Sequence, residues 1–351
     1  MTDPSTADDS PRPHRSRPRL RRATLITAAF TAAAVVAALT WGRQTSAQAA
    51  DVPIAYTYDI DNSLIYKFNT KDRTLVGDPI STAKYGRDIA VTKDGKYAVV
   101  FLSVDRTVVR YDVKTGKQAG DPIKVGKVRG MVISPDDSTL YAAGFSNQIT
   151  RIDLNAWTVG TPIGGLASTG DMRLAISPDG NRLYLTYTFR HLIEAFDTTT
   201  GAKVTQPVDL KDELGRPVVS PDGKYLYVPM IRAGSVLVVD AATDQPVGKP
   251  ISACDGPAYI ALNSDGSRGY VSCSSGDAIA IVDTQKAVRI GDPVKVTRDP
   301  LGSALTPDGK KLWIAHGFGH AVSVLDTTTN TIDGAPIDFP KSRAMVGINI
   351  R

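Results

Sequence analysis

The sequence is poor in the residues that most often build compact catalytic or metal centres. Only two cysteines and four histidines occur among its 351 residues, and aromatic residues make up 7% of the chain. No spacing of cysteines and histidines matches a structural zinc site. A glycine-rich phosphate loop and a Gly-x-Ser-x-Gly nucleophile elbow are also absent. These compact motifs are excluded, whereas a catalytic triad of residues distant in the sequence stays open.

Helical periodicity is lacking as well, because no long stretch beyond residue 50 repeats its apolar residues every 3.6 positions. A tight-turn motif, most often Pro-Asp-Gly, recurs there instead. Its aspartates, separated by 42, 43, 43, 43 and 43 residues, are Asp94, Asp136, Asp179, Asp222, Asp265 and Asp308. A repeat of about 40–50 residues is typical of the blades of a β-propeller.

One repeat, residues 218–260, shows what a unit contains. Short β-branched and aromatic runs at residues 217–220, 225–229, 235–240 and 246–251 predict four strands joined by tight turns. A position five residues after each turn aspartate is usually aromatic, and we expect it to pack between neighbouring sheets. Its occupants are Tyr56, Val99, Tyr141, Tyr184, Tyr227, Tyr270 and Trp313.

The repeat extends to both ends of residues 52–351. The first unit lacks an innermost strand, while residues 345–350 form an orphan strand at the C-terminus. Pairing this strand with residues 52–83 closes a ring and leaves no long exposed edge. The sequence therefore predicts an all-β fold: a seven-bladed β-propeller of four-stranded antiparallel blades, closed by pairing of the C-terminal strand with the first blade.

The repeat resembles the YVTN family of β-propellers. The likeness is clearest in Tyr227-Val228-Pro229, in residues 235–240 and in Pro250-Ile251, and it spans essentially all of residues 52–351. Relatives in that family include periplasmic propellers of the YncE type, surface-layer proteins and lactonase-like or cofactor-enzyme propellers. The resemblance implies the fold, whereas function has to come from a site.

Residues 1–50 have the organisation of a secretory signal peptide. A basic stretch ends at Arg22, an uncharged apolar run covers residues 23–40, and an Ala-x-Ala site ends at Ala49. Cleavage after Ala49 or Ala50 would release the propeller, residues 51–351, to a secreted or extracytoplasmic location without stable membrane insertion. Retention of the apolar run as an anchor is the alternative. Export through Sec and export through Tat both stay open.

The net charge of +5 belongs mostly to this leader. The leader holds seven arginines and three aspartates, and residues 51–351 hold 34 Lys and Arg against 33 Asp and Glu. A nearly neutral propeller gives no reason to expect nucleic acid as a partner. We expect a monomer that binds an anionic small molecule, a glycan or a protein.

The two cysteines, Cys254 and Cys273, are predicted to form a disulfide. Cys254 lies in the loop that enters the sixth blade, and Cys273 ends the second strand of that blade. Antiparallel strand order brings both residues to the same end of the blade, and disulfides persist in exported proteins. Two separate thiols are the alternative.

Arginines recur near the start of the predicted innermost strands, on the face that carries the variable loops. Several guanidinium groups near one axis would bind a carboxylate, phosphate or sulfate through paired hydrogen bonds. The candidate ligand-binding residues are Arg87, Arg129, Arg173, Arg216, Arg298 and Arg343. Neighbouring acids, among them Asp88, Asp171 and Asp299, offer the alternative of internal salt bridges between blades.

The candidate catalytic residues are three histidines on the same face, His191, His316 and His320. Histidine suits acid–base catalysis and metal binding. The fourth and seventh blades lie nearly opposite, so the three side chains meet only if their loops fold inward. Solvated loop histidines are the alternative. No metal site and no cofactor is predicted, although a divalent cation would suit an enzyme at this face.

Three functions are compatible with these features. The leading one is an exported binding or interaction module for an anionic small molecule, glycan or peptide on the variable-loop face. The second is a lactone-type hydrolase or lyase that uses a histidine and carboxylates there. The third is a structural or adhesion propeller of the cell surface.

Overall fold

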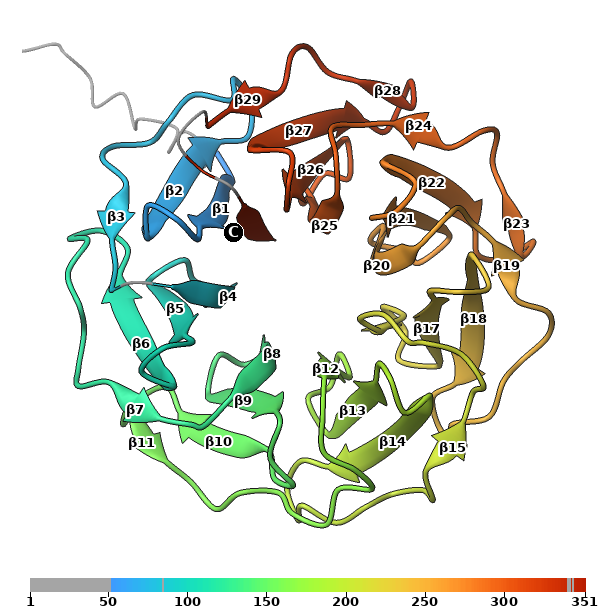
Figure 1. Cartoon of the computed structure of the whole chain (residues 1–351), viewed down its shortest axis with the longest axis horizontal. Helices are drawn as coiled ribbons and strands as arrows, with labels where there is room; N and C mark the ends of the chain where they lie inside the picture. Colours follow the sequence, from blue (N-terminus) through green and yellow to red (C-terminus); the bar gives the residue numbers. More distant parts are fainter. Residues whose placement is uncertain (1–51, 84, 340–341, 343) are drawn as a thin grey trace, which may run out of the picture. The chain divides into compact units, whose positions relative to one another are not determined.

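The computed structural model describes residues 52–83, 85–339, 342 and 344–351, and the regular structure in these ranges is all β. Seven antiparallel sheets follow one another around a ring, which confirms the predicted seven-bladed propeller (Figure 1). The predicted leader, residues 1–50, lies outside the described residues. Within the described ranges no helix is long and apolar enough to cross a membrane.

Blades 2, 3 and 4 show the common plan, from an innermost strand to a short outer one. Blade 2 consists of β4 (Gly86–Val91), β5 (Tyr97–Leu102), β6 (Thr107–Asp112) and β7 (Ile123–Lys124). Blade 3 consists of β8 (Val128–Ile133), β9 (Thr139–Gly144), β10 (Thr150–Asp153) and β11 (Thr158–Val159). Blade 4 consists of β12 (Met172–Ile176), β13 (Arg182–Tyr187), β14 (Leu192–Asp197) and β15 (Val208–Asp209).

Blades 5, 6 and 7 repeat the plan, and the last two carry an additional short outer segment. Blade 5 consists of β16 (Val218–Val219), β17 (Tyr225–Met230), β18 (Ser235–Asp240) and β19 (Ile251–Ser252). Blade 6 consists of β20 (Pro257–Leu262), β21 (Arg268–Cys273), β22 (Ala278–Asp283), β23 (Val288–Arg289) and β24 (Val294–Lys295). Blade 7 consists of β25 (Pro300–Leu305), β26 (Lys311–His316), β27 (Ala321–Asp326), β28 (Thr331–Ile332) and β29 (Ile337–Asp338).

Blade 1 is assembled from both ends of the described chain, as predicted. Its innermost strand is β30 (Met345–Ile350), which pairs antiparallel with β1 (Ile54–Asp59). The sheet continues through β2 (Leu64–Asn69) to β3 (Ile80–Ser81). Figure 1 shows β30, in dark red, beside the blue β1. The C-terminal strand therefore closes the ring.

The outer strand of each blade is shorter than the sequence predicts. In blade 5, Pro246 forms only an isolated bridge with Val239, and β19 begins at Ile251. A glycine with φ of 63–93° and a following proline, which has no N–H, separate the two pieces in five blades. These glycines are Gly77, Gly120, Gly248, Gly291 and Gly334.

The repeated turn is held by a side chain that precedes it. In blade 5 the hydroxyl of Ser220 donates to Oδ1 of Asp222 over 2.6 Å, and the same oxygen accepts the backbone N–H of Lys224 over 3.1 Å. Gly223 adopts φ +74°, which an L side chain tolerates poorly. This local network explains why Ser-Pro-Asp-Gly recurs where an innermost strand turns into the second strand.

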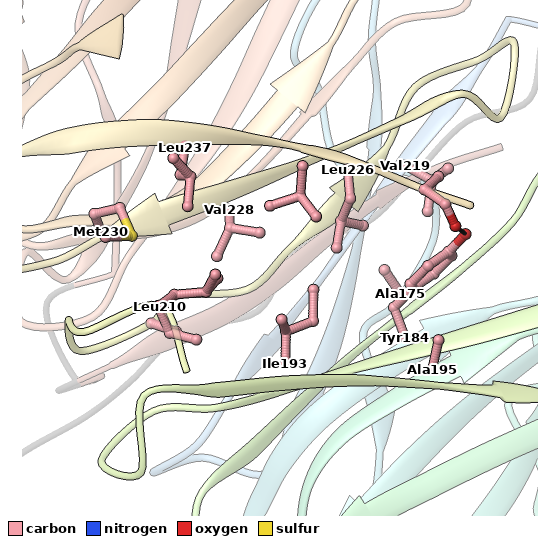
Figure 2. Close-up of a cluster of buried hydrophobic side chains, with 13 residues drawn as sticks. Ala175, Tyr184, Ile193, Ala195, Leu210, Val219, Leu226, Val228, Met230 and Leu237 are labelled. Carbon is pink, nitrogen blue, oxygen red and sulfur yellow. Dashed lines mark hydrogen bonds between the residues drawn. The ribbon is translucent and has the colours of Figure 1, made fainter. Parts of the chain in front are cut away.

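The core lies between neighbouring blades, and Figure 2 shows the cluster between blades 4 and 5. Ile193 from β14 and Leu226 from β17 are fully buried in it. Tyr184 is 1% exposed, and its hydroxyl donates to the carbonyl of Ala241 in the next blade over 2.9 Å. All seven positions of the predicted packing stripe are buried, which confirms that the stripe joins sheets.

Candidate functional site

A cavity of about 330 Å³ opens at the end of the central channel where the innermost strands begin. Its walls come from these strand starts and from loops that follow the second strands, so it lies on the predicted variable-loop face. Its charged lining residues are Arg87, Asp88, Arg129, Arg173, Arg216 and Asp299. We call this cavity the mouth.

β-bulges aim side chains into the mouth. In five blades the innermost strand has one extra residue opposite its partner strand, close to its beginning. A bulge bends the strand and redirects the unpaired residue. The extra residues all line the mouth, and they are Arg87, Arg129, Ala258, Leu301 and Gly347. Their position at a bulge explains why two of the arginines, Arg87 and Arg129, share one repeat phase.

The mouth has a floor made largely by Arg216 and Tyr259. A second cavity of about 260 Å³ lies further along the channel, and these two residues line both cavities. Arg216 extends from blade 5 across to blade 2, where its Nη2 lies 3.1 Å from Oδ2 of Asp88. The same nitrogen donates to the carbonyl of Met131 in blade 3 over 3.3 Å. Arg216 therefore links blade 5 to blades 2 and 3 at the level between the two cavities.

The ion pair with Asp88 stabilises the positive charge of Arg216. Burial acts to lower the pKa of Arg216, but the charge of Asp88, aided by Tyr259, outweighs it and raises the pKa. Asp88 is 9% exposed and also accepts the N–H of Met131 over 2.9 Å, so it ties blade 2 to blade 3. Arg216 therefore uses its guanidinium mainly for contacts within the protein, although it still lines the mouth.

A second ion-pair group lies between blades 3 and 4, and its two arginines, Arg129 and Arg173, line the mouth. Asp171 lies 2.7 Å from Nη1 of Arg173 and 3.6 Å from Nε of Arg129. Burial lowers the pKa of Arg173, and Asp171 opposes that shift. The side chain of Arg129 remains 43% exposed, and a guanidinium with one long ion-pair contact keeps donors for a ligand.

Arg87 and Arg298 have no carboxylate partner among the described residues. Arg87 is exposed and lines the mouth directly. Arg298 is also exposed, and its guanidinium carbon lies 5.9 Å from the ring centre of Phe318 at the rim. Arg343 lies outside the described residues. The structure thus brings four of the six candidate arginines into one cavity, with Arg298 near its edge.

The salt-bridge alternative holds for part of the set. Arg173 and Arg216 are paired with acids, Arg129 is partly paired, and Arg87 is not. Asp299 adds a carboxyl group to the mouth, and burial together with the nearby Asp277 raises its pKa. The mouth is therefore a mixed site in which positive charge exceeds negative charge.

The candidate histidines do not converge. His316 is fully buried at the end of β26, and its Nε2 lies 2.8 Å from Oγ of Ser323. His320, in the loop before β27, is exposed, and its Nδ1 bonds the carbonyl of Ser342. His191 lies in the tight turn before β14 of blade 4. The described residues contain no group of three His, Cys, Asp or Glu side chains placed to hold a metal ion.

His316 should make the propeller sensitive to acid. Burial lowers its pKa from 6.5 to about 4, so below pH 6.5 the unfolded chain gains a proton that the folded chain excludes. Stability is unaffected above pH 6.5 and falls as the pH drops, by about 2 kcal/mol at pH 5. His316→Gln, which retains a nitrogen for Ser323, should remove this part of the loss. Urea unfolding at pH 7 and pH 5 measures it, and identical pH dependence in both proteins would contradict the assignment.

The predicted disulfide is confirmed. Cys254 and Cys273 are joined, with their Cα atoms 6.0 Å apart, and the bond ties the loop entering blade 6 to the end of β21. It closes a loop of 19 residues in sequence separation. Such a cross-link stabilises mainly by restricting the unfolded chain.

Sequence reasoning missed the aromatic residues of the variable-loop face. Tyr259 forms part of the floor, and Phe318, which is 65% exposed, lines the mouth. Phe145 and Phe189 are exposed by 44% and 65% in the loops of blades 3 and 4. Their signal was available, because all three phenylalanines interrupt short polar or glycine-containing loops.

Comparisons with known proteins show the fold. No protein-family profile matches the chain, so membership of the YVTN family is not confirmed, and no curated protein matches it either. Hydrazine synthase of Kuenenia stuttgartiensis is 21% identical, with a TM-score of 0.65 over 78% of this chain and 94% of that one.

Two further solved structures are similar. A functionally unknown protein from Desulfotomaculum acetoxidans is 18% identical, with a TM-score of 0.69 over 85% of this chain and 98% of that chain. A candidate 6-phosphogluconolactonase from Bacteroides uniformis is also 18% identical, with a TM-score of 0.68 over 86% of this chain and 100% of that chain. At these identities the likeness defines the class, a seven-bladed β-propeller, and no activity.

Proposed function

We propose that this chain is an exported, YVTN-type propeller that binds an anionic ligand at the mouth. The observation that carries the proposal is the mouth itself, a cavity of about 330 Å³ in which Arg87 points from a bulge with no carboxylate partner among the described residues. Arg129 adds a second accessible guanidinium. Guanidinium groups bind carboxylate and phosphate through two parallel hydrogen bonds, which favours an anion here.

The rigid floor supports binding. Asp88 and Arg216 hold blades 2, 3 and 5 together at the level of the mouth, so the arginines project from a braced scaffold. A site of this kind loses little conformational entropy when the ligand enters. The disulfide and the predicted signal peptide are consistent with work outside the cytoplasm, in a secreted or cell-surface setting.

A lactone-type hydrolase is a weaker proposal. One solved structure with this fold is described as a candidate 6-phosphogluconolactonase, but the three histidines lie apart in this chain. Burial keeps the imidazole of His316 neutral and away from the cavity lining. Among the residues that line the mouth, Asp299 is a candidate proton donor, because burial and the nearby Asp277 raise its pKa.

The binding proposal is tested with two arginine variants. Arg87→Ala and Arg129→Ala should each weaken binding of citrate or inorganic phosphate by about 10- to 100-fold, because a charge-assisted hydrogen bond contributes about 1.5–3 kcal/mol. Isothermal titration of residues 51–351 measures the change.

Lys224→Ala is the matched control, because Lys224 is a 72% exposed cation on the turn face. It should bind both anions as the wild type does. Wild-type affinity in both arginine variants, or the same loss in the Lys224 variant, would remove the mouth from consideration.

A further inference from the structure

A third cavity shares Arg129 with the mouth and lies between the loops of blades 3 and 4, and no role has been assigned to it. It has a volume of about 350 Å³ and is lined by Arg129, Phe145, Thr169, Asp171, Phe189 and Arg190, among others. The volume is at the lower end of ordinary small-ligand pockets, about 300–1,000 Å³. We call it the phenyl cavity.

Two exposed rings define this cavity. Phe145 follows the last residue of β9, and Phe189 lies in the tight turn in which the N–H of His191 bonds the carbonyl of Tyr187 over 3.0 Å. The two residues are 44% and 65% exposed, and neither belongs to the neighbouring hydrophobic core clusters. Large apolar side chains left beside a hollow are typical of binding surfaces.

Two cations lie near the ring of Phe145, and one of them, Arg129, lines the cavity. The Nζ of Lys127 and the guanidinium carbon of Arg129 lie 5.4 and 5.7 Å from the centre of this ring. A cation gains little over an exposed aromatic face, so Phe145 attracts Arg129 only weakly and Asp171 remains the ion-pair partner of this arginine. Arg190, next to Phe189, is exposed.

Arg129 connects the phenyl cavity to the mouth, because its side chain lines both. One ligand can therefore occupy the two cavities at once, with an acidic group in the mouth and a ring between the loops. Asp171 lines the phenyl cavity and is paired with Arg129 and Arg173, so its charge is largely offset. Its Oδ2 can accept a hydrogen bond from a ligand hydroxyl.

We propose that the phenyl cavity binds a neutral, hydroxyl-bearing ring whose neighbour in the ligand carries a carboxylate, so that the site as a whole takes an acidic sugar chain. The inference rests on the proposed function of the mouth. A sugar ring offers an apolar C–H face to Phe145 and Phe189 and hydroxyls to Asp171 and Thr169. Its uronic-acid neighbour offers a carboxylate to Arg87 and Arg129.

The test compares three sugars by isothermal titration of residues 51–351. The probes are cellobiouronic acid, its neutral counterpart cellobiose, and glucuronate alone. Phe145→Ala and Phe189→Ala should weaken cellobiouronic acid about tenfold and leave glucuronate within about twofold. Val104→Ala is the control, since Val104 is a 65% exposed apolar residue in a blade 2 loop that lines neither cavity.

The outcomes separate this inference from the function of the mouth. Equal affinity of the phenylalanine variants and the wild type for cellobiouronic acid would overturn the role of the phenyl cavity, while citrate binding could still support the mouth. Cellobiose that binds as tightly as cellobiouronic acid would also overturn it, because the acidic group would then contribute nothing. An equal loss in the Val104 variant would do the same. Thermal unfolding confirms that each variant is folded.

Discussion

Deletion of residues 345–351 is expected to abolish cooperative folding of the propeller. These residues form β30, the innermost strand of blade 1, which also contacts β25 of blade 7 and β4 of blade 2. Met345, Ile348 and Ile350 are at most 8% exposed. Their burial alone contributes about 5–9 kcal/mol, which is comparable with the whole stability of an ordinary domain. Circular dichroism during heating should show no single sharp transition.

A permuted chain provides the control for this deletion. Residues 344–351 are moved ahead of residue 54 and joined to it by a Pro-Asp-Gly-Lys turn like that of residues 221–224. Blade 1 then becomes one continuous meander, because Arg351 and Ile54 already exchange backbone hydrogen bonds of 2.7 and 3.0 Å. The permutant should fold with a sharp transition. A truncated chain that unfolds as cooperatively as the wild type would contradict the closure described for β30.

Asp88→Ala is expected to destabilise the propeller by about 2–4 kcal/mol, the second-largest effect. The change leaves Arg216 without its carboxylate and the N–H of Met131 without an acceptor. Removing one partner of a buried ion pair costs about 3–5 kcal/mol, and the partial exposure of Arg216, 26%, reduces this figure. Chemical denaturation at pH 7 measures the loss.

An exposed ion pair gives the matched comparison. Lys211 and Asp209 are paired on the surface with side chains 79% and 40% exposed, so Asp209→Ala should leave the stability close to that of the wild type. In the double variant Asp88→Ala/Arg216→Met the loss of stability should be smaller than the sum of the losses in the two single variants, because no unpaired charge remains. Equal losses of stability in Asp88→Ala and Asp209→Ala would show that the Asp88–Arg216 ion pair does not stabilise the propeller.

The architecture was readable from the sequence because it depends on repeated local features. Turn aspartates such as Asp222 accept hydrogen bonds within their own turn, and an equivalent of Tyr184 is buried in every blade. Each repeat therefore carries the same sequence signal for the same local structure. The outer strands were overestimated. Their apolar residues recur in every blade, but a glycine such as Gly248, at φ +69°, interrupts the hydrogen bonding of the outer strand. Residue propensities alone do not reveal the backbone conformation of that glycine.

The site was predicted only in part, because pairing across the ring joins residues distant in sequence. Arg216 and Asp88 are 128 residues apart, and no spacing rule connects them. The arginines were found by their position near the start of the innermost strands, whereas the bulges that aim Arg87 and Arg129 into the mouth depend on strand register. Phe145 and Phe189 occur once each in unequal loops, so repetition gave no signal for them.

A crystal structure of residues 51–351 grown with cellobiouronic acid would test the acidic-ligand site most directly. The carboxylate should lie within hydrogen-bonding distance of Arg87 or Arg129 in the mouth, and the neutral ring should lie between Phe145 and Phe189. Ligand density at the turn face, or an empty mouth at a concentration that saturates the protein in solution, would contradict this prediction.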